Sequence, residues 1–168
     1  MLVHFPIALL IMYAVLELIR FRFVICQSYW FYVKAVLAIC GTIGGYAALL
    51  TGDTARHLVL LNHPELRALI GQHEFWAQTS VLIFSVLGGA YILAWADQFE
   101  FVRKFPIIKQ LWGTLSWLRR FILSTPVSIL LALAGLVSLT ITGALGGSIV
   151  YTPGNDPFTN WIYHLFIQ

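Results

Sequence analysis

The stretch PVSILLALAGLVSLTITGALGGSIV, residues 126–150, decides the class of fold, because none of its residues is Asp, Glu, Lys or Arg. A helix needs roughly 20 consecutive apolar residues to cross the hydrocarbon core of a bilayer. Residues 5–19, 30–51 and 73–95 are apolar stretches of a similar kind, with one Asp, Glu, Lys or Arg in each. We therefore predict an all-α membrane protein, a four-helix transmembrane bundle that forms a single domain over residues 1–168.

The amino-acid composition excludes a soluble globular domain. Hydrophobic residues make up 60% of the chain and charged residues only 10%, against about 25% charged residues in a typical soluble domain. Motifs of hydrolytic or nucleotide chemistry are missing, since no Gly-rich phosphate loop follows a strand and no H-E-x-x-H pair occurs. We therefore expect a non-catalytic protein rather than an enzyme, and the composition predicts the lipid bilayer as its surroundings and no nucleic-acid partner.

The distribution of positive charge predicts how the chain crosses the membrane. Two basic residues lie between the first and second predicted spans, a third lies in the first turns of the second span, and five lie between the third and fourth spans, so eight of the ten lie in or next to these two connections. Cytoplasmic connections carry an excess of Lys and Arg. We predict a multi-pass protein of the bacterial inner membrane, with both termini and the 52–72 connection on the periplasmic side. The eight residues are Arg20, Arg22, Lys34, Arg103, Lys104, Lys109, Arg119 and Arg120.

Two further helices are expected outside the spans. In the 97–125 connection, apolar residues recur at helical spacing after Pro106, with basic residues on the other side. This pattern is typical of an amphipathic helix on the cytoplasmic membrane surface, where it contacts lipid or docks a partner subunit. In the 151–168 tail, Asp156 as a cap and Pro157 at the first helical position predict a short helix at the outer face.

Glu17 is the single acidic residue within the first predicted span. An interfacial pair with Arg20, three residues further along the helix, is the favoured interpretation. The alternative is a carboxylate that handles protons inside the membrane, because acidic groups are costly there.

A weak internal repeat relates the two halves of the chain. His4 opens the first predicted span and His73 the third, while Thr51-Gly52 ends the second span and Thr142-Gly143 lies in the fourth. This pattern indicates two repeated helical hairpins related by a pseudo-two-fold axis along the membrane normal. His4 and His73 would then lie at equivalent depths on either side of the axis.

The histidines suggest a cofactor site near the outer face. Two imidazoles can hold a haem iron from both sides, and this leaves no open coordination position and favours electron transfer. We expect His4 and His73 as axial ligands of a haem b, with Arg56 or Arg67 beside its propionates. All five histidines lie in segments predicted to be at the outer face: His4, His57, His63, His73 and His164.

Two alternatives to haem stay open. His4, His57 and His73 together could bind copper or zinc, because neutral imidazole suits either metal. The chain could equally bind no cofactor and act as an accessory subunit, since its aromatic and glycine-rich helix surfaces suit packing against larger membrane proteins.

Four motifs resemble one family pattern over residues 3–151. They are V-H-F-P-I-A-L-L at 3–10, T-G-D at 51–53, the His-Glu pair at 73–74, and T-G-A-L-G-G-S-I-V-Y at 142–151. Together they resemble the bacterial membrane family known as domain of unknown function 2231. That resemblance implies a four-helix membrane domain in a redox setting, because some members are joined to cytochrome c-like or Rieske-type modules, and it maps the family's histidine positions onto His4 and His73.

We expect no redox module of this kind within residues 1–168, which is a departure from this family pattern. The chain also has a long connection before the fourth span and its own C-terminal tail. The resemblance therefore implies a subunit of a larger complex, with another membrane or periplasmic redox protein, or a quinone, as its electron partner.

Overall fold

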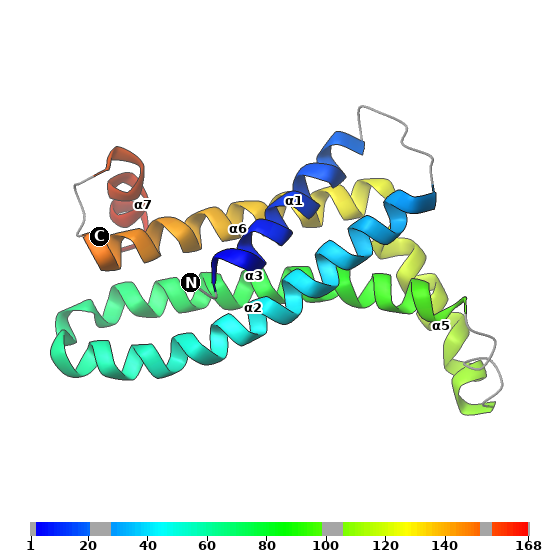
Figure 1. Cartoon of the computed structure of the whole chain (residues 1–168), viewed down its shortest axis with the longest axis horizontal. Helices are drawn as coiled ribbons and strands as arrows, with labels where there is room; N and C mark the ends of the chain where they lie inside the picture. Colours follow the sequence, from blue (N-terminus) through cyan, green and yellow to red (C-terminus); the bar gives the residue numbers. More distant parts are fainter. Residues whose placement is uncertain (1–2, 21–27, 99–105, 152–155, 168) are drawn as a thin grey trace.

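The computed structural model describes residues 3–20, 28–98, 106–151 and 156–167, and throughout these ranges the chain is helical apart from short connections (Figure 1). Arg22, Arg103, Lys104 and the tail residues 152–155 lie outside the described residues, as do the side chains of Arg20 and Lys109. The elements are α1 (His4–Arg20), α2 (Ser28–Asn62), the 3₁₀ helix η1 (Pro64–Leu66), α3 (Arg67–Ala96), α5 (Pro106–Ile122), α6 (Thr125–Tyr151) and α7 (Pro157–Ile167).

Three helical segments are long and apolar enough to cross a membrane: Tyr29–Asn62, Pro64–Ala96 and Thr125–Tyr151. The first predicted span is also an apolar helix, but a shorter one, His4–Ile19. The described chain is thus all-helical, as predicted, and its three long apolar helices indicate a membrane protein.

Helices α2 and α3 run well beyond the predicted spans. Helix α2 has 35 residues and α3 has 30, so at about 1.5 Å per residue they extend roughly 50 and 45 Å. Residues 52–62, predicted as part of a connection, are the last turns of α2, and the reversal to α3 takes only His63 and η1. A helix can continue past the apolar stretch that crosses a membrane, so the ends of α2 and α3 do not fix the bounds of the predicted spans.

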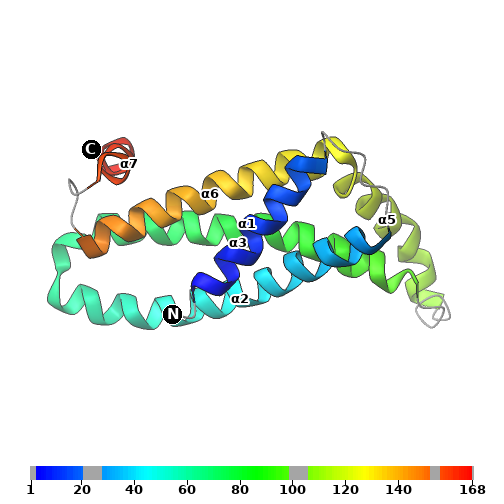
Figure 2. The ribbon, with the colours of Figure 1, turned by 45° about the horizontal axis from the view of Figure 1, so that its top comes forward.

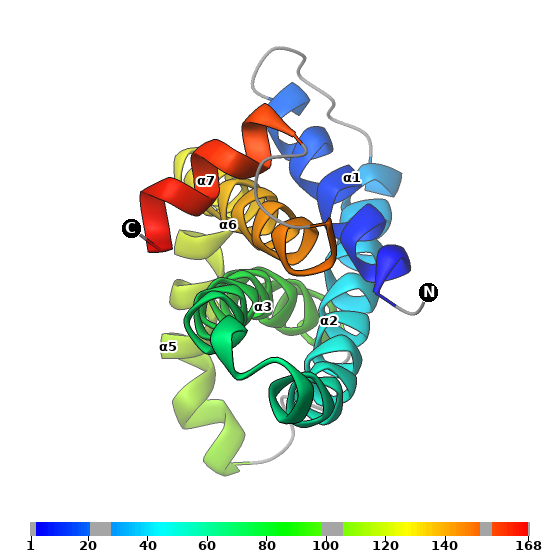
Figure 3. The same ribbon diagram turned by 90° about the vertical axis from the view of Figure 1, so that its left-hand side faces the viewer.

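The four helices α1, α2, α3 and α6 pack side by side in a ring. Helix α1 contacts α2 and α6, and α3 contacts the same two helices from the other side (Figures 1 and 3). The core inside the ring is built on Tyr13, Phe84 and Tyr91, which are almost fully buried. Tyr13 meets both other rings edge to face, with centroids 6.2 and 5.9 Å apart.

Glycines set the spacing between these helices. A methyl group added at Gly135 of α6 would lie 2.7 Å from Phe84 Cζ, and one at Gly41 of α2 would lie 2.5 Å from a Leu10 methyl carbon. Side chains at these positions would push the helices apart, so the glycines permit the close approach that the aromatic core requires.

The two shorter helices lie at opposite ends of the ring. Helix α5 packs mainly against α3, and α7 packs against α6 (Figure 2). The predicted cap of α7 is confirmed, because Asp156 Oδ2 accepts a hydrogen bond of 2.9 Å from the Thr159 backbone N–H and Pro157 occupies the first helical position. Buried Ile162 then joins α7 to a second core of α3 and α6 residues that includes Leu69 and Leu145.

Candidate functional site: a helix-bound histidine and a buried ion pair

Among the histidines predicted as ligands, His73 is the one that the structure places in contact with a neighbouring helix. It lies two turns into α3, rather than at the start of a helix, and it is half-buried against α6. Its Nδ1 lies 2.9 Å from the backbone oxygen of Thr142. A carbonyl oxygen only accepts, so Nδ1 carries the proton, and the neutral ring keeps its lone pair on Nε2.

Gly146 makes this contact possible. A side chain on a helix covers the turn that precedes it, so a larger residue at position 146 would lie over the Thr142 carbonyl. A methyl group added at Gly146 would approach His73 Cε1 to 3.1 Å and Nδ1 to 3.4 Å. The missing side chain therefore opens one backbone carbonyl of α6 to the imidazole of α3.

Hydroxyl groups extend this polar seam between α3 and α6. Ser138 Oγ donates to the Trp76 carbonyl at 3.0 Å and lies 2.8 Å from Ser80 Oγ, and both serines are buried. Such contacts hold helices together in apolar surroundings. They fix His73 relative to α6, because Ser80 and Trp76 lie on the same helix as His73.

The predicted propionate partners differ in their surroundings. Arg56 Nη1 donates to Glu74 Oε2 at 2.6 Å, which ties the end of α2 to the start of α3 beside His73. Arg67 is exposed at the first residue of α3. Arg56 is therefore already engaged by a carboxylate.

The other predicted ligands are exposed. His4 begins α1, and His57 lies in the last turns of α2. Among the described residues, no three His, Cys, Asp or Glu side chains gather closely enough to hold a metal ion. Of the predicted site residues, the structure thus brings together Arg56 and the helix segment of His73.

The two glycine contacts involve different neighbours. A methyl group added at Gly146 of α6 would approach the His73 ring, whereas one added at Gly44 of α2 would lie 2.9 Å from Pro6 Cβ in α1.

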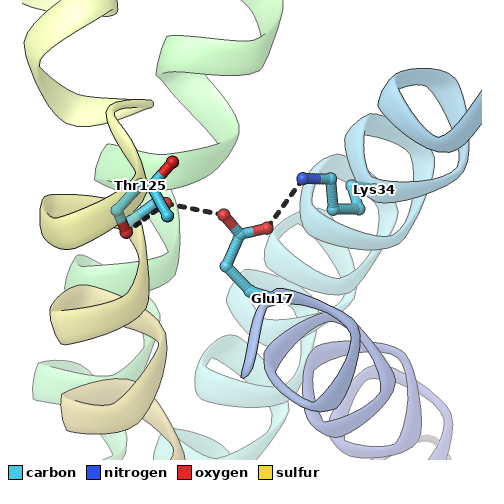
Figure 4. Close-up of polar contacts among 4 residues, drawn as sticks. Glu17, Lys34 and Thr125 are labelled. Carbon is cyan, nitrogen blue, oxygen red and sulfur yellow. Dashed lines mark hydrogen bonds and ion pairs between the residues drawn. The ribbon is translucent and has the colours of Figure 1, made fainter. Parts of the chain in front are cut away.

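A second polar site, which the favoured interpretation of Glu17 missed, lies among α1, α2 and α6 (Figure 4). Glu17 is fully buried. Its Oε2 accepts a hydrogen bond of 2.8 Å from Lys34 Nζ of α2, and its Oε1 accepts one of 2.6 Å from Ser128 Oγ of α6. The carboxylate thus points into the ring of helices, whereas the side chain of Arg20, its predicted partner, lies outside the described residues.

The buried cluster has a clear physical logic. A carboxylate and an ammonium group in apolar surroundings are tolerated when they neutralise and hydrogen-bond each other. Glu17 and Lys34 come from consecutive helices, and Ser128 lies 3.3 Å from the Thr125 carbonyl within the first turns of α6. The signal in the sequence was that the first two apolar stretches carry one charge each, of opposite sign.

Comparison with known proteins gives no relative on which to base a function. No family model, no curated protein and no solved structure matches the chain. The resemblance to domain of unknown function 2231 therefore stays a prediction, and the function has to be argued from the geometry of the two polar sites.

Proposed function

We propose that the chain is a b-type cytochrome-like electron-transfer subunit of a larger membrane redox complex. In this proposal α1, α2, α3 and α6 form a four-helix bundle across the bacterial inner membrane, with both termini on the periplasmic side. His73 and His4 would hold haem b as axial ligands near that side, and the resemblance in the sequence motifs supports the same arrangement.

The observation that carries the proposal is the hydrogen bond between His73 Nδ1 and the Thr142 carbonyl. Histidines that bind metals almost always donate their second ring N–H to a carbonyl or carboxylate, which fixes the ring and makes the other nitrogen a stronger ligand. His73 meets this condition, because its Nδ1 donates to a carbonyl of α6, and its Nε2 makes no hydrogen bond to any described residue. The donor chemistry of His73 thus fits an axial ligand.

His4 would supply the second nitrogen. It is exposed in the first turn of α1, and α1 packs on α2 and α6. Two histidine ligands leave the iron without an open position, so the bound group would pass electrons rather than activate oxygen. Arg67, which is exposed near His73 in sequence, would be the arginine available to a propionate, because Arg56 is paired with Glu74.

The buried ion pair supports placing α1 in the membrane as the fourth span. Helix α1 has 17 residues, about 26 Å in length, which is slightly less than the roughly 30 Å hydrocarbon core. Glu17 and Lys34 would oppose insertion if they faced lipid, but each neutralises the other inside the ring. The sidedness rests on the basic connections, which the sequence predicts on the cytoplasmic side.

A second candidate function is a cofactor-free accessory subunit. Open glycine positions on the outside of the ring favour it: a methyl group added at Gly89 or at Gly143 would meet no atom within 4 Å. Glycines on an outward face let a helix of another protein approach closely. A copper or zinc site formed with His57 would be a third possibility, which metal analysis separates from the other two.

The reduced-minus-oxidised absorption spectrum of the detergent-purified full chain tests the proposal. We expect a low-spin b-type signal, lost in His73→Ala and in His4→Ala and kept in His57→Ala as the matched control. Folding of each variant is checked by circular dichroism and gel filtration. A flat spectrum from folded wild-type protein, purified with haem supplied throughout, would exclude the haem and leave the accessory-subunit function; stoichiometric copper or zinc would favour the third.

A further inference from the structure

We propose that a pocket at the α2 start, α3 end and α5 end binds the phosphate of an anionic phospholipid headgroup. This inference does not depend on the haem proposal, because the pocket lies at the end of the ring opposite the hairpin between α2 and α3 (Figure 1). It requires only that the long apolar helices lie in a membrane.

The pocket has the size and the mixed lining of a ligand site. Its volume is about 490 Å³, within the range of roughly 300–1,000 Å³ that is usual for small-molecule sites. Three of its described lining residues are apolar, and the other four carry hydrogen-bond donors. Its lining residues are Phe31, Tyr32, Ala94, Gln98, Arg119, Arg120 and Leu123.

The charge of the lining matches a phosphodiester. Arg119 and Arg120 contribute two positive charges, and none of the described residues that line the pocket is acidic. Asp97, which lies behind the lining, neutralises Arg119 through a contact of 3.0 Å between its Oδ2 and Nη2. Among the described lining residues one positive charge is therefore left, which matches the single negative charge of a phosphodiester.

Donors are available for the phosphate oxygens. Arg120 Nε donates a hydrogen bond of 3.2 Å to the Ser116 carbonyl, and its Nη groups make no hydrogen bond to any described residue. The Tyr32 hydroxyl donates to Gln98 Oε1 at 3.2 Å, which leaves the Gln98 amide nitrogen as a further donor. Guanidinium groups bind phosphate oxygens through two parallel hydrogen bonds, so Arg120 is the main anchor.

A network behind the pocket holds Arg119 in place. Asp97 accepts a hydrogen bond of 2.9 Å from Trp112 Nε1 as well as the ion pair with Arg119. Both side chains of the ion pair are mostly buried, with 17% and 22% of their surface exposed. The network fixes α5 against the end of α3, so the pocket is formed before a ligand arrives.

The surroundings place the pocket at the headgroup level of a bilayer. Large aromatic side chains are exposed around it on the same three helices: Tyr29, Trp95, Trp117 and Phe121. Aromatic belts of this kind mark membrane–water interfaces. Basic pockets between membrane helices on the cytoplasmic side are typical sites for anionic headgroups. The apolar side chains of Phe31 and Leu123 would contact the first part of the acyl chains.

Native mass spectrometry of the full chain tests the inference, with phosphatidylglycerol and phosphatidylcholine added separately. We expect phosphatidylglycerol to bind at least about five-fold more tightly, and Arg120→Gln and Gln98→Glu each to reduce that preference about five-fold, because one charge at this depth is worth about that factor. Asn62→Asp, an amide-to-acid change in an exposed residue at the far end of α2, should leave it unchanged.

Three outcomes would overturn the inference. One is equal binding of the two lipids by the wild-type chain. Another is a phosphatidylglycerol preference that survives both Arg120→Gln and Gln98→Glu in folded protein. The third is inorganic phosphate alone binding as tightly as the lipid and with the same dependence on Arg120, which would assign the pocket to a free anion and not to a headgroup.

Discussion

Breaking the buried pair of Glu17 and Lys34 should be the most damaging single change to a charge in the protein. In Lys34→Met the carboxylate keeps its 2.6 Å hydrogen bond to Ser128 but loses the ammonium group 2.8 Å away. Glu17 is fully buried, so water cannot replace the cation. Removing one partner of a buried pair typically costs about 3–5 kcal/mol.

The pair as a whole should contribute little to the free energy of unfolding. In the double variant Glu17→Leu, Lys34→Met none of the described buried residues carries a charge, and the Ser128 hydroxyl can turn to the Thr125 carbonyl at 3.3 Å. Replacing a buried ion pair with apolar residues of similar volume is often neutral or stabilising by about 1–4 kcal/mol. We expect the double variant to regain most of the stability that Lys34→Met loses.

Thermal unfolding in detergent, followed by tryptophan fluorescence, measures both effects. At about 2–4 °C per kcal/mol for a chain of this size, Lys34→Met should melt about 6–20 °C below wild type. The pair of Arg56 and Glu74 is the matched control. Its N–O distance is similar, but its side chains are 39% and 33% exposed to solvent. Arg56→Met should therefore cost less than about 1 kcal/mol. Equal melting temperatures for Lys34→Met and Arg56→Met, or a double variant no better than the single one, would refute the reasoning.

Other predictions follow from the packing. Gly135→Ala should destabilise the protein by about 1–3 kcal/mol, because the added methyl group meets the fully buried Phe84 ring at 2.7 Å. Gly143→Ala on the same helix meets no atom within 4 Å and should be neutral or stabilise by up to about 1 kcal/mol; equal effects of the two changes in thermal unfolding would contradict this packing. Asp156→Ala removes the cap of α7 and should cost about 1 kcal/mol locally. Hydrogen exchange should then speed up in α7 and stay unchanged in α3, and unaltered exchange in α7 would show that the cap does not hold the helix.

The helices could be predicted from the sequence because their signals are local. Runs without charge mark the apolar parts of α2, α3 and α6, and the Asp156-Pro157 pair marks the start of α7. The ends of α2 and α3 could not be predicted from hydropathy, since residues 52–57 are mostly polar and yet helical. Hydropathy predicts whether a segment lies in lipid or in water. It does not predict where a helix ends, because a polar segment can stay helical when it follows directly on an apolar helix.

The buried polar contacts depend on pairings between distant parts of the chain. Glu17 and Ser128 are 111 residues apart, and His73 and Thr142 are 69 apart. No periodicity within one helix shows which face of another helix it will meet. The sequence pointed to His73 through its position at the start of the third predicted span, but the role of Gly146 in exposing a carbonyl required the packed helices.

The central claim is that His73 is an iron ligand, and chemical rescue of a cavity variant tests it most directly. His73→Gly removes the imidazole beside Gly146 and leaves room for free imidazole to take its place. We predict that the purified variant, supplied with haem, lacks the low-spin b-type spectrum and regains it when imidazole is added, whereas His57→Gly has the wild-type spectrum throughout. A full low-spin spectrum in His73→Gly without imidazole would contradict the account.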